Sequence, residues 1–335
     1  MEKLLSTRLR DQSLPESYIL PPEKRPNNIA AKCKTIPVID LGQVGKDREA
    51  LVEEIMKASK EFGFFQVINH GVSEKIIKDM MDVGIEFFDM PVEDKMVVYS
   101  EDPKQACRLF SSINYDNEET HFWRDTLRHP VHPVENFKHL WPSKPSNYRE
   151  VTETYSIMVR SLGLRLLELI VEGLGLGSGY FQDELSRVQL LAINHYPPCP
   201  DPSLTLGLPK HSDPNLITVL LQGDIAGLQV LNEGEWISVE PIPSAFIINL
   251  GHILQIISNR SLKSAEHRVV TNSSLTRTTI TTFIYPSMDS TIQPAEELVT
   301  ETNPAKYRAF KYPEFLQLYL ALTADTDDIL NAFMI

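Results

Sequence analysis

From about residue 186 onward, short apolar runs follow one another, separated by turn residues and without a helical repeat between them. The runs are VQLLAINHY, NLITVLLQ, GLQVL, EWISVEP, AFIINLG, LQIISN, HRVVTN and TTITTFIYP. Many short strands at such spacing are typical of closed antiparallel architectures, which leave few unpaired sheet edges. The sequence therefore predicts a mainly β protein with a jelly-roll core, also called a double-stranded β-helix.

The first half of the chain has a different pattern. Residues 47–63 and 73–90 place apolar side chains at helical spacing, and residues 151–176 predict a long helix that ends in a glycine-rich stop. Residues 99–147 lack clean periodicity and predict a long connection, a kind of segment that often carries function. Because the helical region precedes the strands, we expect one β core braced by helices rather than two domains.

This pattern divides the chain into four predicted parts. They are a helix-rich N-terminal region packed on the core (1–150), a long bracing helix (151–185), the jelly roll that holds the chemistry (186–295) and a C-terminal helical lid (296–335).

Charge and cysteine content restrict the partners. A formal net charge of −13 argues against nucleic acid and anionic membranes, which favour a basic face. Cys33, Cys107 and Cys199 form no C-x-x-C pair and predict reduced thiols. The N-terminus lacks the apolar core of a secretory signal, and no apolar run is long enough to span a bilayer. We expect a cytoplasmic monomer whose partner is a small molecule.

His211 and Asp213 lie two residues apart, just before the run NLITVLLQ. Residues i and i+2 of an extended chain project from one face, so this imidazole and this carboxylate can converge on one object. A surface ion pair is the simpler interpretation of the pair alone. His267, in SAEHRVV, is the candidate third ligand from a later strand. Two histidines and a carboxylate leave open positions on iron, whereas structural zinc uses four closed ligands.

A second group of polar residues can bind an acid. Arg277 and Thr279 lie two apart and share a strand face, and so do Asn194 and Tyr196. A guanidinium and a hydroxyl placed in this way can hold the far carboxylate of a dicarboxylic acid.

These motifs, in their order, resemble a known family. NHYPPCP, KHSDPNLITVLLQ, GLQVL, INLG, SAEHRVV and RTT are similar to segments of the plant 2-oxoglutarate- and Fe(II)-dependent dioxygenases. FGFFQVINHG and FWRDTL extend the resemblance upstream, so that it covers roughly residues 35–320. Within the family, the chain looks most similar to the hyoscyamine 6-hydroxylase-like enzymes.

The resemblance implies an oxidoreductase that uses Fe(II), O2 and 2-oxoglutarate as cosubstrate, with ascorbate as an activator. The metal ligands that it implies are His211, Asp213 and His267. The 2-oxoglutarate residues that it implies are Arg277, Thr279, Tyr196 and Asn194. Thr279 departs from the family's usual serine but keeps the hydroxyl. His252 stands where most members carry aspartate, and we expect it to be structural or to line the pocket.

The substrate is less constrained by the sequence. A tropane-type alkaloid and a phenolic or flavonoid of the salicylate or flavanone type are the two candidate classes. Hydroxylation is the expected outcome, with desaturation and epoxidation as alternatives. A metal-free jelly-roll binding protein and an oxidase independent of 2-oxoglutarate are the alternatives from other classes. Aromatic side chains suit a flat or bicyclic molecule. The candidate pocket residues are Phe110, Tyr115, His121, Phe122, Phe283 and Tyr285.

Overall fold

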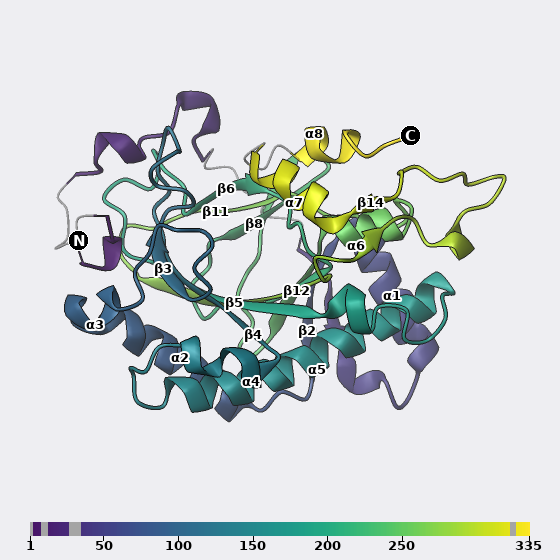
Figure 1. Ribbon diagram of the computed structural model, residues 1–335, viewed down its shortest axis with the longest axis horizontal. Coiled ribbons are helices and arrows are strands. Elements are labelled where there is room, and N and C mark those ends of the chain that lie inside the picture. The colour runs from purple at the N-terminus through teal and green to yellow at the C-terminus, as the bar shows by residue number, and fades with distance from the viewer. Residues whose placement is uncertain (1–2, 8–12, 27–34, 322–325) are drawn as a thin grey trace.

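The computed structural model describes residues 3–7, 13–26, 35–321 and 326–335 (Figure 1). It confirms the jelly roll. An eight-stranded sheet in the order β1-β2-β10-β7-β12-β5-β4-β3 and a four-stranded sheet in the order β6-β11-β8-β9 form the core. In Figure 1, α1, α2, α4 and α5 lie along the side of the large sheet that faces away from β6, β11 and β8.

The bounds of the elements are as follows. The large sheet contains β1 (Val38–Asp40), β2 (Phe64–Ile68), β3 (Arg108–Ser111), β4 (Asp125–His132), β5 (Val188–Tyr196), β7 (Ile217–Leu221), β10 (Phe246–Leu250) and β12 (Arg277–Tyr285). The small sheet contains β6 (Leu208–His211), β8 (Leu228–Asn232), β9 (Glu235–Ser238) and β11 (His267–Val269), and a separate ribbon contains β13 (Thr291–Ile292) and β14 (Phe310–Lys311). The α-helices are α1 (Arg48–Glu61), α2 (Glu74–Asp89), α3 (Val92–Met96), α4 (Val134–Phe137), α5 (Tyr148–Leu174), α6 (His252–Ile257), α7 (Tyr312–Ala321) and α8 (Thr326–Asn331). Short 3-10 turns lie at Leu5–Thr7, Glu16–Tyr18, Pro22–Lys24, Leu41–Gln43, Lys138–Leu140, Asp183–Ser186 and Glu296–Leu298.

The two faces of the large sheet have different neighbours. On the outer face, the side chain of Ile193 lies against Gly84 of α2, and that of Ile284 lies against Gly163 of α5. On the inner face, apolar side chains from both sheets form a separate buried cluster: Phe64, Tyr196, Leu220, Leu228, Val230, Ile247 and Val269. Cross-strand partners point to the same face, so the register assigns every strand residue to the outside or the interior.

One predicted strand is wrong. The run LQIISN lies largely in α6, a helix that starts directly after β10 and the glycine that follows it. Every residue of α6 is buried. A segment buried on all sides has no polar face, so periodicity cannot distinguish a short helix from a core strand there.

The predicted long connection over 99–147 is also more ordered than expected, because it contains β3 and β4. Their residues pair in register with each other and, through β4, with β5. Arg128 and Thr126 face the interior while Asp125 and His129 face outward, so polar residues occur on both faces. The apolar alternation that signals a strand is therefore missing. As a result, β1 to β4, all from the first 150 residues, belong to the core sheet itself.

Two further expectations concern thiols and membranes. Cys107 and Cys199 are buried and free, while Cys33 lies outside the described residues. None of the helices in the described ranges combines the length and the apolar content needed to cross a bilayer.

The turn between α1 and β2 depends on Gly63, where the sequence predicts the end of the helix. Its φ is 68°, and its N–H donates to the Ala58 carbonyl in a C-terminal cap. A Cβ at this position would lie 2.3 Å from the Lys263 carbonyl oxygen. Real side chains essentially never approach a backbone atom so closely, so only glycine fits.

We therefore expect Gly63→Ala to destabilise the protein by roughly 2–5 kcal/mol, the sum of left-handed backbone strain and a backbone clash. Gly45→Ala is the matched control, because a Cβ there meets nothing within 4 Å. It should change the free energy of unfolding by less than about 0.5 kcal/mol. Urea denaturation followed by circular dichroism checks both variants, and equal stabilities would contradict the account of this turn.

Candidate active site

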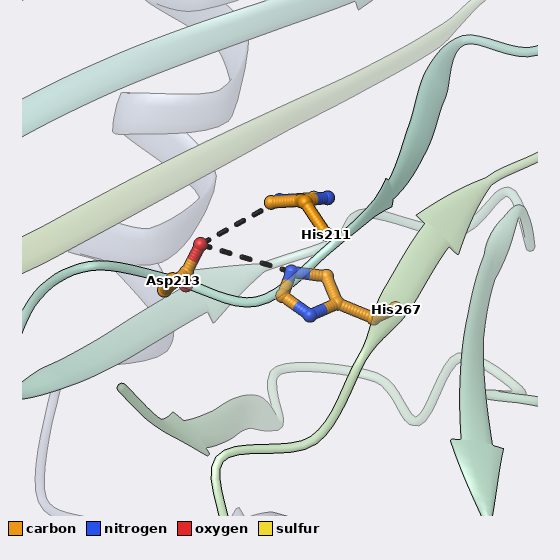
Figure 2. Close-up of side chains that lie close together, drawn as sticks. All are labelled: His211, Asp213 and His267. Carbon is orange, nitrogen blue, oxygen red and sulfur yellow. Dashed lines mark ion pairs between the residues drawn. The ribbon is translucent and has the colours of Figure 1, made fainter. Parts of the chain in front are cut away.

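His211, Asp213 and His267 converge inside the barrel (Figure 2). His211 ends β6 and His267 begins β11, and the two are direct register partners in the small sheet. The Nε2 atoms of His211 and His267 lie 3.6 and 3.8 Å from Oδ1 of Asp213. One ligand atom from each of the three residues lies within 4.8 Å of the others. The predicted same-face pair and the third residue from a later strand are thus brought together.

The backbone orients both imidazole rings. Nδ1 of His211 lies 2.9 Å from the Pro209 carbonyl oxygen, and Nδ1 of His267 lies 3.2 Å from that of Ala265. A carbonyl can only accept, so Nδ1 carries the proton and Nε2 keeps its lone pair. Burial lowers the pKa of His267 to about 4, which keeps this ring neutral at physiological pH. Both Nε2 atoms are therefore prepared to bind a cation.

The carboxylate of Asp213 is oriented by two side chains that sequence analysis missed. Its Oδ2 accepts hydrogen bonds from Oγ1 of Thr218 at 2.5 Å and from Nδ2 of Asn249 at 2.8 Å. Burial by itself would raise the pKa of Asp213, but its contact with His211, the proximity of His267 and the hydrogen bond from Thr218 outweigh burial, so the pKa falls. Oδ1, which faces the two histidines, remains available to bind a metal ion. Thr218 could have been noticed as a lone hydroxyl within an aliphatic run.

This donor set fits the metal that the sequence predicts. Two imidazoles and one ionised carboxylate provide three ligands to a divalent ion, and they leave its remaining positions to small molecules. The hydrogen bonds on Nδ1 and Oδ2 are the outer contacts that fix the ring tautomer and the carboxylate orientation in such sites.

The predicted 2-oxoglutarate residues lie together on the inner face of the large sheet. Arg277 pairs with Tyr196, and Thr279 pairs with Asn194, across β12 and β5. Arg277 is only 2% exposed, and its Nε donates to the Ile225 carbonyl at 2.9 Å. Burial lowers the pKa of Arg277, but a guanidinium stays protonated at physiological pH.

Within the described ranges, no carboxylate forms an ion pair with Arg277. A buried cation without an anionic partner is costly, and a bound anion removes that cost. Asn194 is held by Thr126 at 3.0 Å and Thr281 at 3.2 Å, so its amide is occupied mainly by the protein.

Two glycines make room for these residues and were also missed. A Cβ at Gly207 would lie 2.6 Å from the ring of Tyr196, and one at Gly227 would lie 3.0 Å from Cδ of Arg277. Neither position has a positive φ, so close approach rather than turn geometry explains the glycine. No local sequence signal distinguishes them from glycines in ordinary turns.

The candidate pocket residues separate into two groups. Phe110, Phe283 and Tyr285 face the interior by register. Tyr115 and His121 stack on each other at 3.6 Å in the loop after β3. His121 also contacts Glu118 at 2.9 Å and the ring of Tyr18 at 5.3 Å, and Phe122 follows in the same loop.

His252 lies beside the cluster but does not join it. The backbone N–H of His252 donates to the backbone carbonyl of Asp213 at 2.8 Å. Its fully buried ring packs on Phe315 and Tyr319 of α7. Burial lowers the pKa of His252 to about 4, so the ring is neutral. It lies outside the group of possible metal ligands in the described chain.

The sequence matches two known families over two long segments. Residues 187–286 match the family described as the 2OG-Fe(II) oxygenase superfamily. Residues 36–146 match the family described as non-haem dioxygenase in morphine synthesis N-terminal. The residues assigned above to the metal and the cosubstrate all fall within the first match.

Individual relatives are similar to this protein over nearly the whole chain. Flavanone 3-dioxygenase 2 of Oryza sativa subsp. japonica is 42% identical over 334 residues, 99% of this chain and 97% of that protein. Hyoscyamine 6-dioxygenase of Hyoscyamus niger is 42% identical over 336 residues, 97% of this chain and 96% of that protein. The crystal structure of JOX2 in complex with 2OG, Fe and JA has a TM-score of 0.89 and 33% identity, and covers 99% of this chain and 96% of its own.

We expect Asp213→Ala to weaken Fe(II) binding by more than the roughly 10- to 100-fold that loss of an outer contact costs, because a direct ligand is removed. Asp224→Ala, which deletes an exposed carboxylate, should leave the affinity unchanged. Anaerobic titration calorimetry measures both. Wild-type iron affinity in folded Asp213→Ala protein would refute the metal centre.

Proposed function

The chain belongs to the 2OG-Fe(II) oxygenase superfamily, and on this premise we propose that it hydroxylates a plant specialised metabolite. It is a 2-oxoglutarate-dependent dioxygenase that uses Fe(II). The observation that carries the proposal is the convergence of His211, Asp213 and His267 in an interior that also contains Arg277, which has no ionic partner among the described residues. Relatives whose names specify a flavanone or hyoscyamine support a small organic substrate.

When bound, Fe(II) supplies the oxidising chemistry, in which O2 and 2-oxoglutarate are converted to succinate and CO2 as the substrate is oxidised. The chain's own residues position and isolate the reactants. Arg277 anchors the far carboxylate of 2-oxoglutarate, and the Thr279 hydroxyl assists on the same strand face. The inner apolar cluster of Leu220, Val230 and Ile247 excludes water around them.

Of the two substrate classes, the interior favours a phenolic or flavonoid over a tropane-type alkaloid. A pocket that binds a protonated amine is expected to contain a carboxylate that pairs with the amine's charge. Among the described strand residues that face the interior by register, the acids are Asp40 and Glu235, at the ends of β1 and β9, and neither is buried. Asp213 is committed to the metal centre. Phe110, Phe283 and Tyr285 present aromatic surface instead.

Succinate release tests the proposal directly. Purified protein is incubated with Fe(II), ascorbate, 2-oxoglutarate and a library of plant metabolites, and succinate is quantified with and without each compound. Metabolite-dependent succinate together with an oxygenated product supports hydroxylation. Product without succinate would indicate an oxidase independent of 2-oxoglutarate, and failure to bind iron would indicate a metal-free binding protein. The two buried free thiols support a reducing, cytosolic location.

Arg277→Ala should weaken 2-oxoglutarate binding by about 10- to 150-fold, because a charge-assisted hydrogen bond contributes roughly 1.5–3 kcal/mol. Arg277→Lys should recover only part of the affinity, since an ammonium cannot reproduce the guanidinium fork. Thr279→Ser keeps the hydroxyl and should cost little, whereas Thr279→Val should cost more. Fluorescence or calorimetric titration measures each variant, and an unchanged 2-oxoglutarate affinity in Arg277→Ala would exclude the assigned role.

We also propose that the C-terminal segment acts as a lid through α7. Its Tyr312 and Tyr319 hydroxyls donate to the Pro214 and Ser212 carbonyls at 3.0 and 2.9 Å, on either side of Asp213. Amide hydrogen exchange over residues 312–321 should therefore slow when Mn(II), 2-oxoglutarate and an active metabolite are added. The first turns of α5 provide the reference. Equal protection of α7 with and without ligands would count against a lid.

A further inference from the structure

Two arginines face each other directly across adjacent strands. Arg108 of β3 and Arg128 of β4 are register partners, and Phe110 and Thr126 are the next pair on the same face. Thr126 pairs in turn with Asn194, which places this face in the barrel interior. Like charges directly opposite each other destabilise a sheet, so the pair needs an explanation.

Arg108 is buried without an ionic partner. It is 8% exposed, and its guanidinium carbon lies 3.9 Å from the ring centre of Phe110. Burial and the neighbouring Arg128 lower the pKa of Arg108 to about 10, which leaves it protonated near neutral pH. The charges of Glu101 and Asp102 partly offset this lowering, but neither acid forms an ion pair with Arg108 among the described residues. Glu101 lies 3.5 Å from Lys3 and accepts a hydrogen bond from Tyr99.

Arg128 is solvent-exposed. Burial raises the pKa of Tyr285, the charge of Arg128 partly offsets that rise, and the charge of Asp213 adds to it. Arg128 offsets the rise at Tyr312 of α7 in the same way. Tyr285 therefore lies within the fields of both Arg128 and the metal-site carboxylate. Across the described residues, neither Arg108 nor Arg128 forms a side-chain hydrogen bond or an ion pair.

This pair is separate from the 2-oxoglutarate residues. Arg128 lies in register with Ala192 of β5 and, through it, with Thr281 of β12. Arg277 lies four residues from Thr281, roughly 13 Å along the strand, and two strands across. A dicarboxylic acid bound to Arg277 leaves the buried Arg108 and the adjacent Arg128 without a carboxylate partner. The interior thus offers a second anion site.

We propose that Arg108 and Arg128 bind a carboxylate of the substrate, so that the substrate is an organic acid rather than an amine. This inference rests on the proposed function, because it assigns the substrate of the same site. Two guanidinium groups provide planar donor forks that match a carboxylate, and its charge relieves their mutual repulsion. The rings of Phe110, Phe283 and Tyr285 suit an aromatic or alicyclic skeleton between the carboxylate and the metal centre.

Binding to matched compounds tests the charge requirement without turnover. The probes are benzoic, cinnamic and indole-3-acetic acids, the methyl ester of each, and the amine tropine. Saturation-transfer NMR with the full chain and 2-oxoglutarate gives their affinities. We expect at least one acid to bind at least tenfold more tightly than its ester and than tropine. Equal or tighter binding of esters or tropine, or no binding of any acid, would overturn the proposal.

Variants locate the site. Arg108→Gln and Arg128→Gln should each weaken binding of the preferred acid by about 10- to 100-fold and leave binding of its ester unchanged. Arg187→Gln is the control, since this exposed arginine pairs with Glu184 instead. Arg108→Gln removes a buried unpaired charge, so its melting temperature should equal or exceed the wild-type value. Arg128 is exposed, so its variant tests the site even if Arg108→Gln does not fold. Retained acid preference in Arg128→Gln would overturn the proposal.

The two proposals can fail independently. The 2-oxoglutarate affinity should stay at the wild-type level in both variants, because Arg277 is intact. Succinate formation with neutral metabolites and no preference for acids would refute the carboxylate site and leave the dioxygenase function standing. Acid-selective binding that depends on Arg128, without succinate from any metabolite, would refute the hydroxylase and leave the anion site standing.

Discussion

The burial of the Asp213 carboxylate inside the barrel is the constraint on which the surrounding structure depends. An ionised carboxylate away from water is costly unless hydrogen bonds and opposite charges compensate it. Thr218 of β7 and Asn249 of β10 donate to one oxygen, while the two histidines of the small sheet face the other. Both sheets must therefore close around this residue. A metal ion bound at the site would balance the remaining negative charge of the carboxylate.

The same reasoning applies in reverse to the cations of the interior. The chain is acidic as a whole, with a formal net charge of −13, yet Arg108, Arg128 and Arg277 occupy inward-facing strand positions. Buried guanidinium groups without partners store an unfavourable energy that an anionic ligand releases. Such a site favours anionic ligands, because only they neutralise the guanidinium groups that the protein leaves without an ionic partner.

These features reduce stability locally, and the rest of the fold compensates. Like-charged partners across β3 and β4 weaken that edge of the sheet. Glycines at 207 and 227 give up side-chain packing so that Tyr196 and Arg277 fit. The outer face of the sheet, by contrast, is packed against α2 and α5 through a large apolar core. The apolar packing that stabilises the fold thus lies mainly on the outer face of the large sheet, and the residues assigned to ligand binding lie on its inner face.

Local patterns determined much of this protein. Helical spacing predicted α1, α2 and α5, the two-residue spacing of His211 and Asp213 predicted that they converge, and the ordered motifs indicated the family and its cofactors. Tertiary structure decided that LQIISN is helical and that β3 and β4 join the core sheet. It also decided which side chains donate hydrogen bonds to the Asp213 carboxylate, and that Arg108 lies opposite Arg128 across two strands. These features depend on cross-strand register and on burial by distant segments, and neither is encoded in the spacing of residues along one strand.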